Sequence, residues 1–355
     1  MSLDDLRKKI DSIDADIVRL IGERIKIARE IGGEKRSQGR QVNDRAREKR
    51  VLSHIKALAR SENLDQEVIE DIYQQIITAC RRTQGAEVAF QGETGAYGEE
   101  ATFQFFGPMV TTRPYESLEE VFKATEGDEA QFGIIPVENS LEGSISQSYD
   151  LLLDSSLKVC GEIELRVVHC LIANPGVRLD SIKRVYSHPQ ALGQCKAFLK
   201  HLNCELIPTY DTAGSVKMIK EQGITDGGAI ASTRAAEIYQ MKVIAREIED
   251  NPNNFTRFFI LSREDSPPSG NDKTSIVFSV KDKPKALYHF LGEFAKRDIN
   301  LSKIESRPTR HKPWEYNFYL DFDGHREDKV SQEALASSEE HTIFVKILGS
   351  YPKAK

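Results

Sequence analysis

Apolar residues near the start of the chain recur in alternating steps of three and four, which is the spacing of a long amphipathic helix. These positions are Leu3, Leu6, Ile10, Ile13, Ile17, Leu20, Ile27 and Ile31. The same step would place an apolar residue at position 24, where the sequence has arginine. A buried arginine is costly unless an anion meets it, so Arg24 is a candidate binding residue, although its side chain could also extend from a coiled-coil seam into solvent.

The helical pattern continues to about residue 84. The glycine pair at 32–33, then SQGRQ at 37–41, is expected to end the first helix, and a second helix is expected to begin near Asn43 or Asp44. A third helix follows. Because no strand-like alternation occurs in this region, residues 1–85 are predicted to form an all-α domain.

After residue 86 the pattern changes to short apolar runs such as FGIIPV and RFFIL, separated by Gly/Pro turns and amphipathic helices. This pattern predicts an α/β domain over 86–265. The segment REDSPPSGNDK at 263–273 is typical of a linker. The region 274–350 then shows the order βαββαβ, which predicts a ferredoxin-like domain.

Composition excludes several classes of protein. A chain of 355 residues is long enough for two or three domains, and it contains no apolar run near the ~18 residues of a membrane span. Its start, MSLDDLRKKIDSID, lacks the apolar segment of a secretory signal, so we expect a cytoplasmic enzyme and no membrane partner. The five cysteines are an odd number without Cys-x-x-Cys spacing, which indicates neither a disulfide framework nor a zinc site.

Charge separates the first domain from the rest of the chain. The net charge is -6, but residues 1–85 carry +3 and the remainder carries -9. Acidic residues are interspersed among the basic ones and no aromatic platform accompanies them, so a nucleic-acid partner is not expected.

The helical domain contains polar residues with helical spacing. Arg24 and Lys35 are about three turns apart on one helix face. Two further sets of residues each share one helix face. The first set is Asp44, Arg47 and Glu48, at i, i+3 and i+4, and the second is Cys80 and Gln84, at i and i+4. The domain has neither a nucleophile–base pair nor a metal-ligand cluster, so the chemistry indicated is recognition of a polyanion with redistribution of charge.

These residues resemble the all-α chorismate mutase family in the segments LRKKI, GERIKIAREIGGEK, VNDRARE and CRRTQ. The resemblance covers 1–84 and implies rearrangement of chorismate to prephenate. It implies that arginines hold the substrate carboxylates, that Lys35 and Gln84 contact the ether oxygen, and that Glu48 positions the hydroxyl with Asp44. The implied mutase site comprises Arg7, Arg24, Lys35, Asp44, Arg47, Glu48, Cys80 and Gln84.

Helix geometry adds an expectation about assembly. Arg7 and Arg24 lie 17 residues apart, which is about 26 Å along a straight helix and beyond the reach of one small ligand. If both contact chorismate, two chains share the site. We therefore expect a homodimer or a dimer of dimers.

The α/β region contains small polar clusters where strands end, as ligand sites in open sheets do. They include GETGAYG, PVENS, YSHPQ, YDTAGS and NFTRF. The first lacks Gly-x-Gly-x-x-Gly, so a nicotinamide cofactor is not expected. His188 in YSHPQ could be catalytic or could be a turn residue.

Together these segments resemble the prephenate dehydratase family over 86–262, most specifically in PVENS and NFTRF. The resemblance implies two α/β lobes around a cleft, similar to periplasmic binding proteins, and conversion of prephenate to phenylpyruvate without a cofactor. It implies that Thr256 is the principal catalytic residue. Arg257 and Phe258 would shape its loop, and Asn139, Ser140, Thr212 and Ser232 would contact the substrate.

The proton source of this reaction is less defined. A threonine hydroxyl is a poor acid, so we expect Thr256 to donate a hydrogen bond to the departing hydroxyl. Glu138 could supply the proton if burial raises its pKa, or it could cap a neighbouring loop. Gly98 replaces the hydroxyl residue usual in the family.

The C-terminal region resembles the ACT domain of these dehydratases in IESRP at 304–308 and PWEYNFYLDFDGH. The resemblance implies L-phenylalanine as a feedback inhibitor at a dimer interface. The implied effector site comprises Ala286, Leu287, Glu305, Ser306, Arg307 and Pro308. Lys285 stands where the family commonly has glycine.

The chain is thus expected to carry both activities of phenylalanine biosynthesis, mutase and dehydratase, with regulation by phenylalanine. Two alternatives remain open. One is a dehydratase whose helical segment serves only to dimerise the chain, and the other is a phenylalanine-sensing protein without catalysis.

Overall fold

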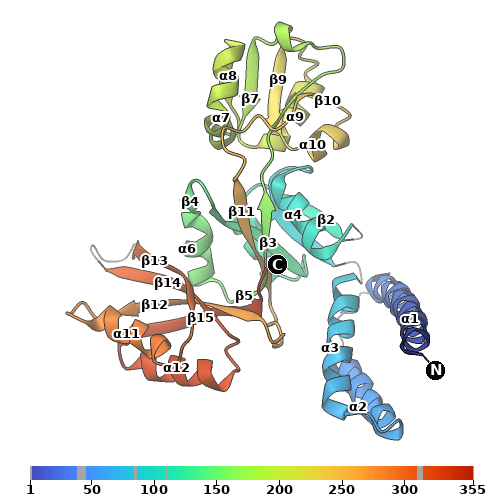
Figure 1. Cartoon of the computed structure of the whole chain (residues 1–355). Helices are drawn as coiled ribbons and strands as arrows, with labels where there is room; N and C mark the ends of the chain where they lie inside the picture. Colours follow the sequence, from blue (N-terminus) through green and yellow to red (C-terminus); the bar gives the residue numbers. More distant parts are fainter. Residues whose placement is uncertain (1, 38–44, 84–85, 109, 310–314, 355) are drawn as a thin grey trace. The chain divides into compact units, whose positions relative to one another are not determined.

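The computed structural model describes residues 2–37, 45–83, 86–108, 110–309 and 315–354 (Figure 1). These residues form two compact units. One unit contains Met1–Glu87 with Phe103–Thr111, and the other contains Val88–Thr102 with Thr112–Lys355.

The first unit contains the helices predicted from the apolar spacing. They are α1 (Leu3–Ser37), α2 (Arg45–Ser61) and α3 (Gln66–Thr83), and α3 packs against both of the others. Helix α1 continues through the glycine pair at 32–33 and ends at Ser37, the first residue of SQGRQ, so the predicted end is confirmed at SQGRQ and is wrong for the glycines. Each glycine costs only about 1 kcal/mol in a helix, which a helix already propagated over thirty residues tolerates.

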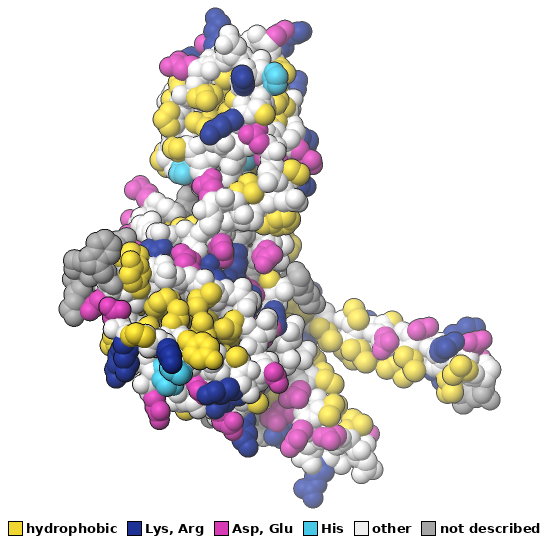
Figure 2. Space-filling view, turned by 60° about the vertical axis from the view of Figure 1, so that its left-hand side comes forward, with side chains coloured by type: hydrophobic (Ala, Val, Ile, Leu, Met, Phe, Trp, Pro, Cys, Tyr) yellow, Lys and Arg dark blue, Asp and Glu magenta, His cyan; other side chains and the backbone are white. Residues whose placement is uncertain are grey.

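The apolar seam of α1 is exposed in the single chain. Each of its large apolar side chains is 46–63% exposed, and the seam comprises Leu3, Leu6, Ile10, Ile13, Ile17, Leu20, Ile27 and Ile31. Figure 2 shows apolar side chains running along this helical unit. Such a row on one face is typical of a helix that packs against another chain.

The α/β region begins with a sheet in the order β2-β1-β3-β11-β5, with β4 paired to β3. Its strands are β1 (Glu87–Gln91), β2 (Thr111–Tyr115), β3 (Phe132–Asn139), β4 (Gly143–Ser144), β5 (Lys158–Arg166) and β11 (Phe255–Ser262). Its helices are α4 (Tyr97–Phe106), α5 (Leu118–Glu126) and α6 (Ser146–Asp154). Strand β11 is antiparallel to both β3 and β5.

Between β5 and β11 the chain forms a second sheet in the order β10-β6-β9-β7-β8. Its strands are β6 (Cys170–Ala173), β7 (Arg184–Ser187), β8 (Glu205–Pro208), β9 (Gly227–Ala231) and β10 (Lys242–Ala245). Its helices are the 3-10 turn η1 (Leu179–Ser181), α7 (Pro189–Gln194), α8 (Lys196–Leu202), α9 (Thr212–Glu221) and α10 (Thr233–Ile238). The region is therefore divided into two lobes, as Figure 1 shows.

The C-terminal domain has the predicted order βαββαβ. Its elements are β12 (Asp272–Val280), α11 (Ala286–Ala295), β13 (Leu301–Pro308), β14 (Tyr316–Asp323), α12 (Lys329–Glu339) and β15 (Thr342–Pro352). The sheet order is β13-β14-β12-β15, and every pair in it is antiparallel. Phenylalanines from α11 and the sheet form the core between them.

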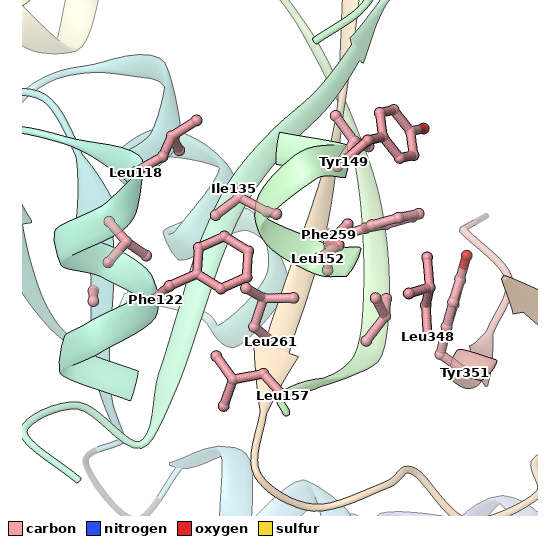
Figure 3. Close-up of a cluster of buried hydrophobic side chains, with 14 of the residues drawn as sticks. Leu118, Phe122, Ile135, Tyr149, Leu152, Leu157, Phe259, Leu261, Leu348 and Tyr351 are labelled. Atoms are coloured by element: carbon pink, nitrogen blue, oxygen red, sulfur yellow. The ribbon is translucent and has the colours of Figure 1, made fainter. Parts of the chain in front are cut away.

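The other face of the C-terminal sheet packs against the first lobe of the α/β region. One cluster of buried apolar residues includes Ile135, Leu152 and Phe259 from that lobe together with Leu348 and Tyr351 of β15 (Figure 3). At Gly349 the backbone of β15 passes so close to β5 that an added Cβ would lie 2.0 Å from the carbonyl oxygen of Val159. A glycine is required there because only glycine permits this approach.

No helix in the described part of the chain combines the length and the apolar character that crossing a membrane requires.

Candidate active sites

A cavity of about 210 Å³ lies in the α/β region and is lined by both lobes. The first lobe contributes the ends of β1 and β3 and the starts of β11 and α4, and the second lobe contributes the starts of α7 and α9. Its polar lining residues include Gln91, Tyr97, Asn139, His169, His188, Gln190, Gln194, Asp211, Thr212 and Thr256. The sequence clusters GETGAYG, PVENS, YSHPQ, YDTAGS and NFTRF thus each contribute to one cavity.

Thr256 and Asn139 are neighbours on the part of the cavity wall that the first lobe forms. The two residues are register partners on the antiparallel strands β11 and β3. Asn139 Nδ2 donates to Thr256 Oγ1 at 3.1 Å. Because the threonine oxygen accepts this bond, its own proton is available to a ligand in the cavity.

A hydrogen-bond network fixes the Asn139 amide. Asn139 Nδ2 also donates to Asn254 Oδ1 at 2.8 Å, and Asn254 Nδ2 donates to Gln194 Oε1 at 2.9 Å. Gln194 Nε2 donates to the carboxylate of Glu142 at 2.9 Å, which sets the orientation of the Gln194 amide. The network therefore connects α7 of the second lobe to Thr256 of the first.

His169 joins the same network and was not identified from the sequence. Its Nε2 lies 2.8 Å from Gln194 Oε1, which can only accept, so Nε2 carries the proton. Its Nδ1 lies 2.9 Å from the hydroxyl of Tyr97. Burial lowers the pKa of His169, which favours the neutral imidazole. A single polar residue inside the apolar run RVVHCLIA was the available signal.

The electrostatics of the cavity depend on helix ends. Among the described residues that line it, none is lysine or arginine. The first residues of α4 and α9 line it instead, and the free N–H groups of a helix start attract anions. Asp211 caps α9 through Gly214 N, and burial raises the pKa of this carboxyl group. Burial therefore favours the neutral acid and limits the negative charge that Asp211 adds to the cavity.

Several other predicted residues also line the cavity. Thr212, Phe258, Gly98 and His188 are among them. His188 Nδ1 accepts from Gln190 N and so caps α7. Ser232 is buried, caps α10 and donates to Gly95 O.

Four predicted residues, among them the buried Ser232, lie outside the described cavity lining. Ser140 exchanges hydrogen bonds with the backbone of Asn253 and Phe255, which makes it a support for the NFTRF loop. Glu138 and Arg257 are absent from the described cavity lining, because adjacent side chains on a strand point to opposite faces. Both contact the C-terminal domain, so Glu138 lies outside the cavity that a proton source would line, and the expectation that Arg257 shapes the loop of Thr256 stays a prediction.

In the helical unit the structure brings two of the predicted mutase residues together. Arg24 of α1 donates to the sulfur of Cys80 on α3, which is buried. Arg7 is exposed and pairs with Asp4, and Arg47 is exposed on α2. The backbones of Lys35 and Glu48 lie in α1 and α2, but their side chains are outside the description, as are Asp44 and Gln84 entirely.

The predicted effector residues in the C-terminal domain point in two directions. Lys285 precedes α11 with φ of +70°, a left-handed conformation that favours glycine. Ala286 is buried and Leu287 packs against the domain core. Along β13, Glu305 and Arg307 contact serines of the first lobe, Ser144 and Ser146, whereas Ser306 and Pro308 alternate with them and are exposed.

Family models match three successive parts of the chain. Residues 6–85 match Chorismate mutase type II, residues 88–266 match Prephenate dehydratase, and residues 274–340 match the ACT domain. A bifunctional chorismate mutase/prephenate dehydratase of Aquifex aeolicus is 39% identical over 359 residues, covering 99% of this chain and 98% of that protein.

Two further similarities cover the dehydratase and ACT regions. Arogenate dehydratase/prephenate dehydratase 2 of Arabidopsis thaliana is 44% identical over 276 residues, covering 75% of this chain and 72% of that protein. A crystal structure of prephenate dehydratase from Arthrobacter aurescens in complex with L-Phe has a TM-score of 0.69 and 32% identity, covering 75% of this chain and 90% of that chain.

A mutase domain, a dehydratase domain and an ACT domain in this order define a multifunctional enzyme with isomerase and lyase parts. The chain belongs to the bifunctional chorismate mutase/prephenate dehydratase family, which acts in phenylalanine biosynthesis.

Proposed function

We propose that the cavity around Thr256 binds prephenate and converts it to phenylpyruvate. The ring hydroxyl leaves with a proton as water, the ring carboxylate leaves as carbon dioxide, and the electron pair of the broken C–C bond completes the aromatic ring. Aromatisation supplies the driving force, so the reaction needs no cofactor. The observation that carries this proposal is the Asn139–Thr256 pair on the cavity wall.

In this proposal Thr256 donates a hydrogen bond to the departing hydroxyl. The amide of Asn139 occupies the threonine oxygen and directs the hydroxyl proton to the ligand. The imidazole of His188 and the carboxyl group of Asp211 line the cavity and are the proposed sources of the transferred proton. Glu138 is not retained in this role, because Lys303 binds its carboxylate outside the cavity.

The substrate carboxylates are proposed to meet the starts of α4 and α9. Prephenate is a dianion, and the described lining contains no lysine or arginine. Helix N–H groups together with the amides of Gln91, Gln190 and Gln194 supply neutral donors. Neutral donors hold the ring carboxylate without the strong ion pair that would oppose its loss as carbon dioxide.

For the mutase reaction we propose that Lys35 and Gln84 stabilise the ether oxygen while arginines hold the two carboxylates. Catalysis then consists of conformer selection and electrostatic stabilisation. The exposed apolar seam of α1 supports a dimer in which Arg7 of one chain completes the site that contains Arg24 of the other. The third helix supports Arg24 through Cys80.

Feedback by L-phenylalanine is proposed to act through the ACT domain. The similar prephenate dehydratase of Arthrobacter aurescens was crystallised in complex with L-Phe. In this chain the exposed side of β13, with Ser306 and Pro308, is the part of the ESRP segment free to meet an effector. We place the effector between that side and the loop at 284–287, where Ala286 and Leu287 start α11.

The finer fold assignments agree with this proposal. The two lobes joined through β5 and β11 resemble a periplasmic binding protein in arrangement, and the sheet order β13-β14-β12-β15 is that of a ferredoxin-like domain. The cytoplasmic location and the dimer of dimers stay predictions.

The decisive experiment is product analysis from chorismate with the purified chain. We expect prephenate and then phenylpyruvate, with phenylpyruvate formation reduced by L-phenylalanine. Phenylpyruvate from prephenate but no turnover of chorismate would leave a single-activity dehydratase. Binding of phenylalanine without either product would leave a sensing protein.

A further inference from the structure

Two charged residues lie on β3 and β11, on the face of these strands that is turned away from the cavity and from Asn139 and Thr256. Glu138 precedes Asn139 on β3, Arg257 follows Thr256 on β11, and Glu138 and Arg257 are register partners. Adjacent side chains on a strand point to opposite faces. The same two strands therefore hold the cavity pair, Asn139 and Thr256, and the back pair, Glu138 and Arg257. A displacement of the back pair therefore moves the cavity pair.

Lys303 of the ACT domain meets Glu138 in a largely buried position. Its side chain is 11% exposed, and its Nζ lies 2.9 Å from Glu138 Oε2 and 2.8 Å from Ser144 Oγ. The same ammonium lies 3.2 Å from Glu305 Oε2 and 5.3 Å from the centre of the Tyr149 ring. Lys303 thus connects β13 to both β3 and β4.

Arg257 is held in the same way by the ACT sheet. Its Nη1 lies 2.6 Å from Asp321 Oδ2 on β14, and its Nη2 donates to the hydroxyl of Tyr351 on β15 at 3.2 Å. Glu162 of β5 binds its other side, with Nε at 2.8 Å. Burial alone would lower the pKa of Arg257, but Asp321, Tyr351 and Glu162 raise it overall, so this guanidinium is a fixed charge.

We propose that Lys303, a residue of the ACT domain, is a positioning residue for the dehydratase reaction, acting through Glu138 on the Asn139–Thr256 pair. Removing the Lys303 ammonium leaves the carboxylates of Glu138, whose side chain is 35% exposed, and of Glu305 near each other without the cation that pairs with both. Glu138 then turns toward solvent or toward Arg257, which lies 4.0 Å away, and the end of β3 follows it. The inference rests on the proposed dehydratase function of the cavity.

The test compares the turnover of prephenate by the full chain and its variants. In Lys303→Met, which keeps the aliphatic stem, we expect kcat to fall about 5- to 20-fold with KM within about 2-fold, because substrate-binding groups remain in place. Lys303→Arg should recover to within about 3-fold of wild type. Arg326→Met is the matched control, since Arg326 is another partly buried ACT cation that pairs with a carboxylate, Asp265 in the linker.

Glu138→Gln keeps the proposal falsifiable if Lys303→Met folds poorly, because it removes the same interaction from the other side and should reproduce the loss. Where Lys303→Met folds, the double variant should lose no more than the single variants, because both remove one interaction. Additive losses, a Lys303→Met kcat within 2-fold of wild type, or an equal loss in Arg326→Met would overturn the proposal. Failure of the wild-type chain to turn over prephenate would instead refute the dehydratase function itself.

Discussion

Asn139 and Thr256 are joined by a 3.1 Å hydrogen bond in which the amide donates and the threonine oxygen accepts. The direction of this bond matters more than its length, because it leaves the hydroxyl proton for the substrate. A threonine that donated to a protein acceptor would be a structural residue.

Replacing Thr256 with valine, which has a similar volume, should reduce the dehydratase kcat by about 100-fold or more, as loss of an oriented donor does. Chorismate should still be converted, so prephenate should accumulate and can be followed by chromatography. Thr256→Ser, which keeps the hydroxyl, is the control and should retain most of the rate. Phenylpyruvate formation within a few-fold of wild type in the valine variant would show that Thr256 is structural.

Lys35→Ala should abolish the mutase reaction by removing the positive charge at the ether oxygen, at a cost of about 3 kcal/mol or more in the barrier. Turnover of added prephenate should be unchanged, because none of the described residues that line the dehydratase cavity belongs to the helical domain. Near-normal conversion of chorismate by this variant would remove the proposed mutase mechanism.

Subunit mixing tests whether two chains share the mutase site. Arg7→Ala and Lys35→Ala chains are each expected to be inactive, but a mixed dimer contains one site with both residues intact. Some chorismate turnover should return after the two proteins are mixed. If labelled subunits exchange and no activity returns, each site lies within one chain.

The buried imidazole of His169 predicts a pH dependence. Because burial lowers its pKa below 6.5, the neutral form stabilises the fold above that value, and this contribution is lost as the pH falls through 6.5 toward the lower pKa of the folded state. Wild type should therefore lose stability between about pH 7 and pH 5 relative to His169→Gln, which does not titrate. Denaturant unfolding at several pH values measures this difference, and parallel curves for the two proteins would contradict the prediction.

Lys285 predicts a gain in stability. Its φ of +70° is unfavourable for a residue with a Cβ, and glycine relieves this strain at some cost in the entropy of the unfolded chain. We expect Lys285→Gly to raise the free energy of unfolding by about 0.5–1 kcal/mol. Calorimetry with L-phenylalanine on both proteins then shows whether the lysine obstructs the effector: tighter binding only in the glycine variant means that it does.

Periodicity predicted the regular parts of the fold. The three-and-four spacing from Leu3 to Ile31 predicted α1, and the order βαββαβ predicted the ACT domain, because each pattern reflects one apolar face. That α1 continues through Gly32 and Gly33 could not be predicted, since tolerance of these glycines depends on the whole helix.

The site was only partly predictable, for two physical reasons. The motif PVENS brings Asn139 to the cavity and turns Glu138 away, and the sequence cannot say which neighbour faces inward when the register with β11 shifts next to Arg257. His169, Gln194 and Asn254 meet through tertiary contacts between the two lobes, and no local spacing encodes that meeting.

Gly349 determines how closely the C-terminal sheet can approach β5, because its α-hydrogen stands where any other residue has a Cβ. A methyl group there cannot be accommodated by rotating a side chain, because it would meet the backbone of Val159. Alanine at this position would act as a wedge that pushes the regulatory sheet away from β5 without altering a residue of either catalytic site. A substitution this small would therefore measure how far each activity depends on the contact between the regulatory sheet and the first lobe, because every residue except glycine carries the Cβ that this contact excludes.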